Sequence, residues 1–234
     1  MKAYYQTHVG LVREQNEDTV LTDEELGLFI LADGMGGHQA GEVASLMAAT
    51  ALRDSLQEAS PSAERLQMAF RAANHAVFQR QQEDPALAGM GTTMTALWLD
   101  GDHVLLGHVG DSRAYAFLNG RLRQISEDHS VVGEMVRSGA ITEEQARTHP
   151  YRNVITRAVG TENTLRADVA EFLLNPGEVF LLCSDGLTDM ATDEEIADVL
   201  AHCTPEEAAP ALIDLALQHG GRDNVSVLLL EVDA

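Results

Sequence analysis

The chain has 234 residues, of which 45% are hydrophobic and 22% are charged, an ordinary composition for a folded globular protein with one sizeable core. Fifteen lysine and arginine residues against 37 aspartate and glutamate residues give a formal net charge of -22. This acidity argues against nonspecific binding to nucleic acid or to an anionic membrane, so we expect neither as a partner.

The first part of the chain predicts three strands followed by two helices. Short apolar runs indicate the strands, and Ala, Leu, Met and Glu at helical spacing indicate the helices. Ser60 ahead of Pro61 is typical of a helix start. The predicted strands cover residues 3–9, 19–22 and 28–32, and the predicted helices cover residues 41–58 and 62–83.

The remainder predicts strands joined by short connections, and then a strand, two helices and a final strand. Asn119-Gly120 is a strong hairpin signal, and Thr192 and Thr204 are suited to cap helices. The predicted strands cover residues 94–100, 103–109, 112–118, 121–125, 179–183 and 225–232, and the predicted helices cover 193–202 and 205–219. Because short connections favour antiparallel strands, we predict an α+β sandwich of antiparallel sheets flanked by helices, as a single domain over residues 1–234.

The segment 134–160 is less regular than its surroundings. It contains Gly139 and Pro150, and two short helical patterns cover residues 131–138 and 142–148. Periodicity leaves two interpretations open, namely a flap subdomain over a site and a long surface connection.

Cysteine content and the N-terminus indicate the compartment. Cys183 and Cys203 are the two cysteines of the chain, which is too few for a disulfide framework. The N-terminal residues lack the apolar stretch of a signal peptide, and no apolar run approaches the roughly 18 residues that span a membrane. We therefore expect a cytoplasmic protein without a membrane partner.

Four aspartates stand beside glycine or asparagine next to apolar runs, namely Asp33, Asp111, Asp185 and Asp223. Each turn taken alone has an ordinary interpretation, and Gly110-Asp111 alone is typical of a hairpin turn. If the four carboxylates converge, they repel, by about 4 kcal/mol for a pair about 4 Å apart at an effective dielectric near 20. Converging carboxylates therefore indicate a cation site, and a donor set made only of oxygen suits Mg²⁺ or Mn²⁺.

The combination of motifs makes the chain similar to the metal-dependent protein serine/threonine phosphatases of type 2C, in their compact bacterial form. The resemblance extends from Thr7 to Val232. Its motifs are Arg13 with Asn16-Glu17-Asp18, Asp33-Gly34-Met35-Gly36-Gly37, Gly91-Thr92-Thr93, Gly110-Asp111-Ser112-Arg113, Ser184-Asp185-Gly186-Leu187 and Asp223-Asn224.

This resemblance implies a four-layer α-β-β-α sandwich, with two central antiparallel sheets flanked by helices and a flap subdomain at residues 134–160. It also implies the activity. A hydroxide that bridges two metals attacks the phosphorus of phosphoserine or phosphothreonine in a protein, without a phosphoenzyme, and so opposes serine/threonine kinases. Phosphorylated proteins and a kinase are therefore the implied partners, and the implied state is a monomer.

The resemblance also assigns roles to the site residues. Asp33, Asp185 and Asp223 hold one Mn²⁺ or Mg²⁺, and Asp33 with the Gly34 carbonyl holds a second. A weaker third ion is assigned to Asp111 with Asp185. Arg13 binds the substrate phosphate, which a guanidinium can contact bidentately. Three further residues have supporting roles: Glu17 and Asp18 act in or behind the metal shell through waters, and Asn224 binds near the phosphate.

One position departs from the family pattern. Some members have histidine directly after the Asp-Gly pair, where it can protonate the leaving alkoxide, whereas this chain has Met35. His38 lies three residues further on, and the sequence does not show that it takes over this role. A water on the Asp111 ion is an alternative acid, and the general acid is therefore left open.

Competing interpretations make different demands on the sequence. A cysteine phosphatase needs arginine six residues after Cys203, where this chain has Ala209. P-loop and His-Glu-x-x-His motifs are absent from the sequence. A catalytically dead regulatory binding module would lack metal aspartates or Arg13, all of which are present. A phosphatase of small phosphate esters is the remaining alternative.

Overall fold

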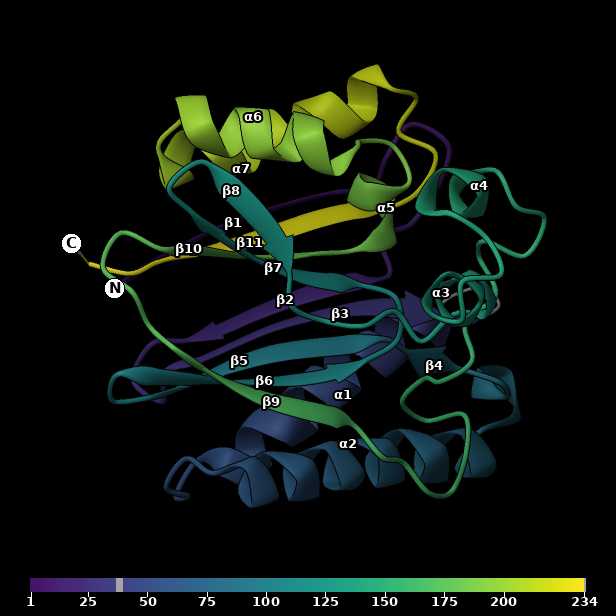
Figure 1. Ribbon diagram of the computed structural model, residues 1–234. Helices are drawn as coiled ribbons and strands as arrows, with labels where there is room; N and C mark the ends of the chain where they lie inside the picture. The colour runs from purple at the N-terminus through teal and green to yellow at the C-terminus, as the bar shows by residue number, and fades with distance from the viewer. Residues whose placement is uncertain (37–39, 234) are drawn as a thin grey trace.

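The computed structural model describes residues 1–36 and 40–233. Two antiparallel sheets pack face to face, and helices cover the outer face of each sheet (Figure 1). This is the predicted four-layer sandwich. Among the described residues, no helix is both long enough and apolar enough to cross a membrane.

The first sheet carries the N-terminal strand at one edge and the Asn119-Gly120 hairpin at the other. Asn119 and Gly120 both have positive φ, 51° and 74°, as a tight hairpin of this type requires. The strands, in spatial order, are β1 (Lys2–His8), β11 (Val225–Glu231), β10 (Val179–Cys183), β7 (Arg113–Leu118) and β8 (Arg121–Gln124).

The second sheet contains the remaining strands. Asp18 of β2 lies directly opposite Asp33 of β3 across the antiparallel pair. In spatial order the strands are β2 (Asp18–Asp23), β3 (Leu28–Met35), β5 (Met94–Asp100), β6 (His103–Val109) and β9 (Asp168–Leu173), while β4 (Gly91–Thr92) pairs with the end of β3.

Helices cover the two outer faces, and those on the first sheet begin with the predicted threonine caps. Thr192 and Thr204 each accept a hydrogen bond from the backbone of the first turn, within complete capping boxes. The other predicted start is off by two residues, because Ser62 rather than Ser60 is the cap of α2. The helices α6 (Asp193–His202) and α7 (Pro205–Gln218) cover the first sheet, and α1 (Ala40–Leu56) and α2 (Ala63–Glu83) cover the second.

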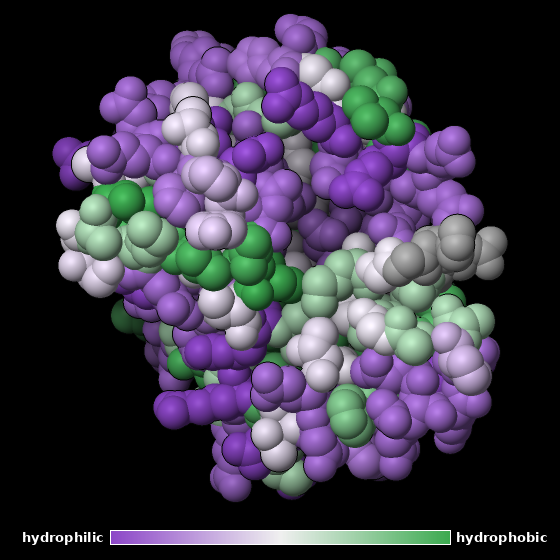
Figure 2. Space-filling view, turned by 90° about the vertical axis from the view of Figure 1, so that its right-hand side faces the viewer, coloured by the Kyte–Doolittle hydropathy of each residue, from purple (hydrophilic) through white to green (hydrophobic). Residues whose placement is uncertain are grey.

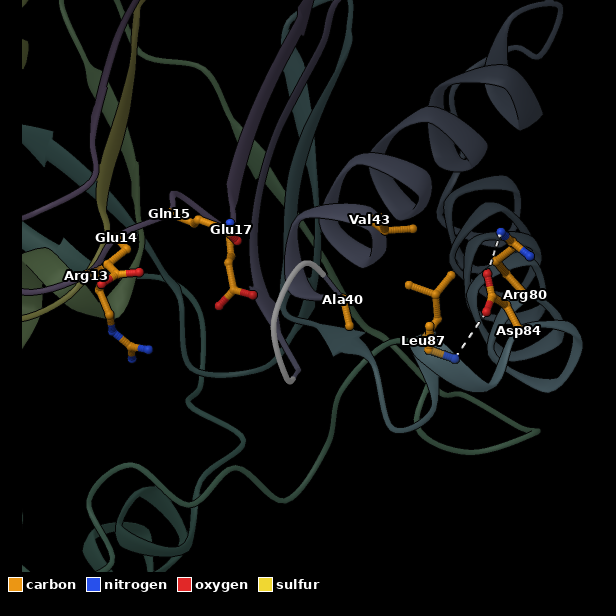
Figure 3. A pocket seen from close by; sticks show the side chains of 10 residues that line it. Arg13, Glu14, Gln15, Glu17, Ala40, Val43, Arg80, Asp84 and Leu87 are labelled. Atoms are coloured by element: carbon orange, nitrogen blue, oxygen red, sulfur yellow. Dashed lines mark hydrogen bonds and ion pairs between the residues drawn. The ribbon is translucent and has the colours of Figure 1, made fainter.

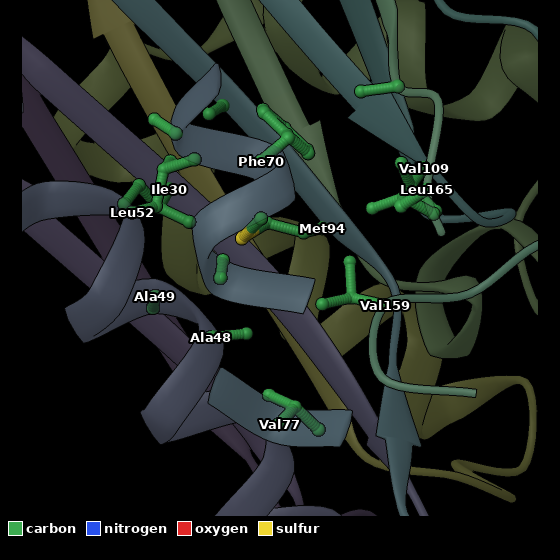
Figure 4. Packing of buried hydrophobic residues seen from close by; sticks show 14 of the residues in the cluster. Ile30, Ala48, Ala49, Leu52, Phe70, Val77, Met94, Val109, Val159 and Leu165 are labelled. Carbon is green, nitrogen blue, oxygen red and sulfur yellow. The ribbon is translucent and has the colours of Figure 1, made fainter. Parts of the chain in front are cut away.

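Three hydrophobic clusters hold the four layers together. One lies between the second sheet and its helices, where Met94 of the sheet packs with Leu52 of α1 and Phe70 of α2 (Figure 4). A second lies beneath α6 and α7, and the third joins the two sheets through residues such as Phe29 and Phe180. Since the central strands are buried on both faces, they appear in sequence as continuous apolar runs rather than alternating ones.

The structure also corrects the prediction within the strands. Gly110-Asp111 is not a hairpin turn, because β6 and β7 belong to different sheets and the chain crosses between the sheets here. Strand β3 continues to Met35, so Asp33 lies within a strand rather than after it. Strand β9 was not predicted, because it is a half-exposed edge strand without a continuous apolar run.

Short elements complete the chain, and several lie at one end of the sandwich. The two helical patterns predicted near residues 134–160 are present, and both helices lie beside the end of the sheets at which α5 begins (Figure 1). These short elements are α3 (Val131–Arg137), α4 (Glu143–Arg147), α5 (Asp185–Thr188) and the 3-10 helix η1 (Pro85–Leu87).

Candidate active site

The four predicted aspartates meet at one end of the sandwich. Asp33 lies on β3, and Asp111 lies at the crossing between the sheets. Asp185 begins α5 directly after β10, and Asp223 precedes β11, which is the antiparallel neighbour of β10. The negative charges of Asp185, Asp111 and Asp223 all act to raise the pKa of Asp33, as does that of Asp18 across the strand pair. The fold therefore brings together four predicted aspartates that are up to 190 positions apart in the sequence.

The surface at this end of the molecule is hollowed. Figure 2 shows hydrophilic residues around the hollow and a hydrophobic band beside it. An adjoining open cavity of about 800 Å³ reaches from Arg13 and Glu17 to the end of α2 and to η1 (Figure 3). Its far wall includes the Arg80–Asp84 ion pair, 3.1 Å apart, and the Leu87 side chain. The carboxylate cluster thus lies next to an open cavity that begins at Arg13 and Glu17.

Gly34 occupies a position that only glycine can fill. A Cβ atom at this residue would lie 2.1 Å from the Gly41 carbonyl oxygen at the start of α1 and 2.6 Å from the Glu17 carbonyl oxygen. The Gly34 amide also donates a hydrogen bond of 3.1 Å to that Glu17 oxygen. The glycine therefore lets the start of α1 and the Glu17 segment close directly onto the strand that carries Asp33.

Burial is the main cause of unusual proton affinity in this cluster. It raises the pKa of Asp18 to about 6 and that of Asp111 to about 7, helped by the charges of Asp223 and Asp128 respectively. Burial and neighbouring carboxylates also raise the pKa values of Asp33 and Asp185 well above the usual range. Each ionised form is thus disfavoured both by lost hydration and by like charge.

Two buried carboxylate oxygens have no hydrogen-bond partner among the described residues, namely Asp18 Oδ1 and Glu17 Oε1. The other Asp18 oxygen accepts a hydrogen bond of 2.9 Å from Ser184 Oγ. Burial also raises the pKa of Glu17, although the nearby Gly41 amide opposes this shift. Buried polar atoms without partners are uncommon in folded proteins, and here they border a cluster of like charges.

The donor set fits a divalent cation such as Mn²⁺ or Mg²⁺ in charge and chemistry, because it contains carboxylate and carbonyl oxygens only. Among the described residues, no three His, Cys, Asp or Glu side chains are arranged around one point as metal ligands. Asp223 Oδ2 is instead turned toward the Arg13 Nη2 atom, 2.6 Å away, and Asp18 toward Ser184. An ion shared by three carboxylates therefore requires some of these side chains to rotate.

Arg13 is the cationic group beside the cluster, on the loop after β1. Its side chain is 50% exposed, and it makes the 2.6 Å ion pair with Asp223. The hydrogen bond to Asp223 is the main cause of its raised pKa, so the guanidinium is charged at any physiological pH. A half-exposed guanidinium at the rim can also reach an anionic ligand from solvent.

Asn224 is buried and uses its side chain to hold the loop that carries Arg13. Its Nδ2 donates to the Val9 and Gln15 carbonyl oxygens at 2.9 and 2.8 Å, and its Oδ1 accepts from the Glu17 amide at 2.8 Å. These bonds engage both amide hydrogens of the side chain. The expectation that Asn224 binds near the phosphate stays a prediction, and in this structure its partners are backbone groups of the loop.

Asp189 is a further carboxylate near the site that the sequence analysis did not identify. It lies four residues after Asp185, directly after α5, and its charge acts to raise the pKa values of both Asp111 and Asp185. The spacing of four residues was the available signal, since it places two side chains on the same side of a helical turn.

Met35 lies at the end of β3, opposite Gly91 of β4. A Cβ atom built on Gly91 would lie 2.7 Å from the terminal methyl of Met35, so this side chain packs against the β4 backbone. The thioether carries no dissociable proton, which agrees with the expectation that Met35 is not an acid. His38 lies outside the described residues.

The sequence matches the family described as protein phosphatase 2C over residues 7–216. It is 43% identical over 226 residues to the serine/threonine protein phosphatase PstP of Mycobacterium tuberculosis, covering 95% of this chain and 43% of that protein. The chain therefore spans less than half the length of this relative. It is 38% identical over 243 residues to the serine/threonine phosphatase stp of Listeria monocytogenes, covering 100% of this chain and 96% of that protein.

The fold is similar to a solved structure of the catalytic domain of PstP in complex with two manganese ions. The TM-score is 0.89 at 39% sequence identity, and the match covers 99% of this chain and 98% of that chain. The four-layer architecture and the order of elements therefore agree with a known fold of this type.

The carboxylate cluster predicts an unusual response of stability to Asp185→Asn. Carboxylates whose folded-state pKa is raised destabilise the folded chain above that pKa, and this penalty disappears as the pH falls from about 7 toward 4. In metal-free protein at pH 8, we expect Asp185→Asn to raise the free energy of unfolding by at least about 1 kcal/mol, or about 2–4 °C in Tm. Thermal unfolding with and without Mn²⁺ checks this, and a variant less stable than the parent in metal-free buffer contradicts it.

The hydrogen bonds of Asn224 predict a structural cost for Asn224→Leu. Leucine has a shape similar to that of asparagine but forms no hydrogen bonds, so the backbone groups of Val9, Gln15 and Glu17 lose their side-chain partner. We therefore expect a loss of about 2 kcal/mol or more in unfolding free energy. Urea unfolding measures this loss, with Asn163→Leu on the exposed surface as the matched control. Equal stability of the Asn224 variant and the control would show that these bonds do not hold the loop.

Proposed function

Because the chain belongs to the protein phosphatase 2C family, which is metal-dependent, we propose that it hydrolyses phosphoserine and phosphothreonine in proteins. The observation that carries this proposal is the group of half-buried carboxylates from separate segments beside a half-exposed arginine. The named relatives, serine/threonine phosphatases of Mycobacterium and Listeria, support the same activity.

We assign the cations to the carboxylate cluster in the following way. Asp33, Asp185 and Asp223 hold one ion, and Asp33 with the Gly34 carbonyl holds another. Asp111 with Asp185 forms a third, weaker site, and Glu17 and Asp18 act through water. Manganese is supported by the two ions in the PstP structure, and magnesium suits the same oxygen donors. When bound, such ions lower the pKa of water and stabilise negative charge on phosphoryl oxygens.

Arg13 provides the phosphate contact in this proposal. Its guanidinium is charged and half exposed, and one of its nitrogens already contacts a carboxylate oxygen of Asp223. Planar nitrogen donors match the oxygens of a phosphate monoester, so Arg13 orients the substrate phosphate toward the carboxylate cluster. The same loop is held in place by Asn224, which makes that residue a support for the phosphate contact.

The reaction adds water to the phosphorus, breaks the bond to the serine or threonine oxygen, and releases inorganic phosphate. The leaving oxygen must gain a proton, and Met35 cannot supply one. Glu17 borders the cavity beside Arg13, and its pKa is raised, chiefly by burial. Proton delivery to the leaving oxygen therefore comes from a group other than residue 35.

The substrates in this proposal are phosphorylated proteins. The partner enzymes are serine/threonine kinases, whose phosphorylated products this protein dephosphorylates. The open cavity beside Arg13 leaves room for the part of a protein substrate that flanks the phosphate (Figure 3). We assign the segment 134–160 as a flap near this substrate, because its helices lie at the same end of the sandwich. The cytoplasm and a monomeric state complete the proposal.

Neither alternative has comparable support. A dead binding module is disfavoured by the presence of Asp33, Asp111, Asp185, Asp223 and Arg13 together. A phosphatase of small esters is disfavoured by the relatives named as protein phosphatases.

Metal-stripped protein tests the activity directly. On a phosphothreonine peptide, we expect turnover that appears with millimolar Mn²⁺ or Mg²⁺ and is lost in Asp185→Ala, because that carboxylate serves more than one ion. A nucleotide monoester is the matched substrate control and should react far more slowly. Metal-independent turnover, or equal turnover by Asp185→Ala, would overturn the proposed chemistry.

Arg13→Ala separates binding from chemistry. The loss of the guanidinium should raise KM for the phosphopeptide by about tenfold or more while kcat changes less, since the contact acts on the phosphate before and during the reaction. Arg13→Lys should recover only part of the loss, because an ammonium lacks the planar pair of donors. An unchanged KM in Arg13→Ala rules out the phosphate contact.

A further inference from the structure

Two buried histidines surround the backbone that precedes Asp111. His108 is 1% exposed and His129 is 4% exposed, and their ring centroids lie 5.0 Å apart. Neither belongs to the carboxylate cluster, and the proposed reaction uses neither. Both contact Gly110, the residue at which the chain leaves the second sheet and crosses to the first.

His129 makes hydrogen bonds to both backbone polar groups of Gly110. The Gly110 amide donates a hydrogen bond of 3.1 Å to His129 Nδ1, and the Gly110 carbonyl accepts one of 2.7 Å from the His129 amide. Because Nδ1 accepts, the proton of the neutral ring is on Nε2, which lies 3.1 Å from Asp168 Oδ2 and 3.0 Å from Arg157 Nη1 and donates to the carboxylate, since the guanidinium has no acceptor. A chain of hydrogen bonds therefore runs from the Asp168 carboxylate through the imidazole to the backbone beside Asp111.

His108 completes the enclosure from the other side. Its Nε2 lies 3.1 Å from the Gly110 and Glu127 carbonyl oxygens, so Nε2 carries the proton and donates to them. Its Nδ1 accepts from the Thr95 hydroxyl at 2.9 Å. Burial lowers the pKa of His108 to about 4, and burial also lowers that of His129, so both rings are neutral near pH 7.

The conformation at Gly110 needs such support. Its φ is +111°, and a Cβ atom there would lie 2.5 Å from the Thr93 side chain, so the chain turns sharply and is closely packed. Thr93 in turn donates its own amide to the Asp33 carbonyl and contacts the Ser112 hydroxyl at 2.7 Å. The peptide held by the histidines thus fixes the point from which the Asp111 side chain enters the site.

The same network binds the C-terminal part of the 134–160 segment, which contains Thr156 and Arg157 and is called the return limb below. The Thr156 amide donates to the His129 carbonyl at 2.7 Å, and Arg157 Nη1 donates to Asp168 Oδ1 at 2.8 Å. Although partial burial acts in the opposite direction, the hydrogen bonds from His129 and Arg157 hold the pKa of Asp168 below its usual range. Asp168 therefore remains an ionised acceptor for both partners.

We propose that His129, oriented by Asp168 and backed by His108, is a positioning residue that sets the placement of Asp111 and links it to the return limb of the 134–160 segment. This inference rests on the proposed phosphatase function, in which Asp111 contributes to turnover. It assigns a role to a histidine that touches neither substrate nor reacting atoms, and it predicts that His129 acts only through Asp111.

Two conservative variants divide the contacts of His129. In His129→Asn, the amide oxygen can take the place of Nδ1 and accept from the Gly110 amide. In His129→Gln, the amide nitrogen can take the place of Nε2 and donate to Asp168, while the Gly110 amide loses its acceptor. His75→Gln on the exposed face of α2 is the matched control.

The activity test is a double-mutant cycle with Asp111→Asn, measured on a phosphothreonine peptide at saturating Mn²⁺. We expect His129→Gln to lower kcat by about tenfold or more with KM within about twofold, and to have little further effect in the Asp111→Asn background. His129→Asn should stay within about threefold of the parent, since it keeps the Gly110 acceptor. Equal losses from His129→Gln in both backgrounds, or equal losses from the two His129 variants, would overturn the inference.

Amide hydrogen exchange gives a readout that does not depend on activity. In His129→Gln, the Gly110 amide should exchange faster than in the parent, whereas His129→Asn and the His75→Gln control should leave it protected. Unchanged protection in His129→Gln contradicts the positioning role. If the parent protein shows no metal-dependent turnover, the proposed function fails, and this exchange comparison alone then supports or overturns the positioning of Gly110.

Discussion

The mutual repulsion of crowded, poorly hydrated carboxylates is the constraint on which the site depends. Asp33 and Asp185 are half-buried with Asp18 and Asp111 nearby, and their pKa values are raised by lost hydration and by the charges of neighbouring carboxylates. A protein that kept such a cluster for stability alone would do better with apolar or amide side chains. The cluster is therefore understandable as a cation site whose cost to folding is offset when divalent ions bind, which ties the stability of the chain to its function.

The scaffold around the cluster fixes backbone more than side chains. Thr93 holds the Asp33 backbone, Asn224 holds the loop of Arg13, and His129 holds the peptide before Asp111. Each of these groups is buried, and each joins segments far apart in sequence. These hydrogen bonds to the backbone leave the carboxylate oxygens available for ions, which suits a site held in place by the residues around it.

Sequence reasoning identified the layered fold and the converging aspartates because both leave local signals, namely continuous apolar runs and glycine beside aspartate. It missed β9, since a half-exposed edge strand has no such run, and it interpreted Gly110-Asp111 as a hairpin, since strand pairing across a short turn is not visible in one sequence. The supporting roles of Asn224 and His129 depend on hydrogen bonds to segments about 20 to 215 residues away, which no local pattern encodes.

The most direct test of this account is calorimetry of Mn²⁺ binding to metal-stripped protein at pH 6 in two buffers of different ionisation enthalpy. Since Asp18 and Asp111 have pKa values of about 6 and 7, and those of Asp33 and Asp185 are also raised well above the usual range, the account predicts that ion binding releases protons. The apparent heat should therefore differ between the buffers, and Asp185→Asn should abolish most of the binding. Binding without proton release, or equal binding by the variant, would contradict the claim that this carboxylate cluster is the cation site.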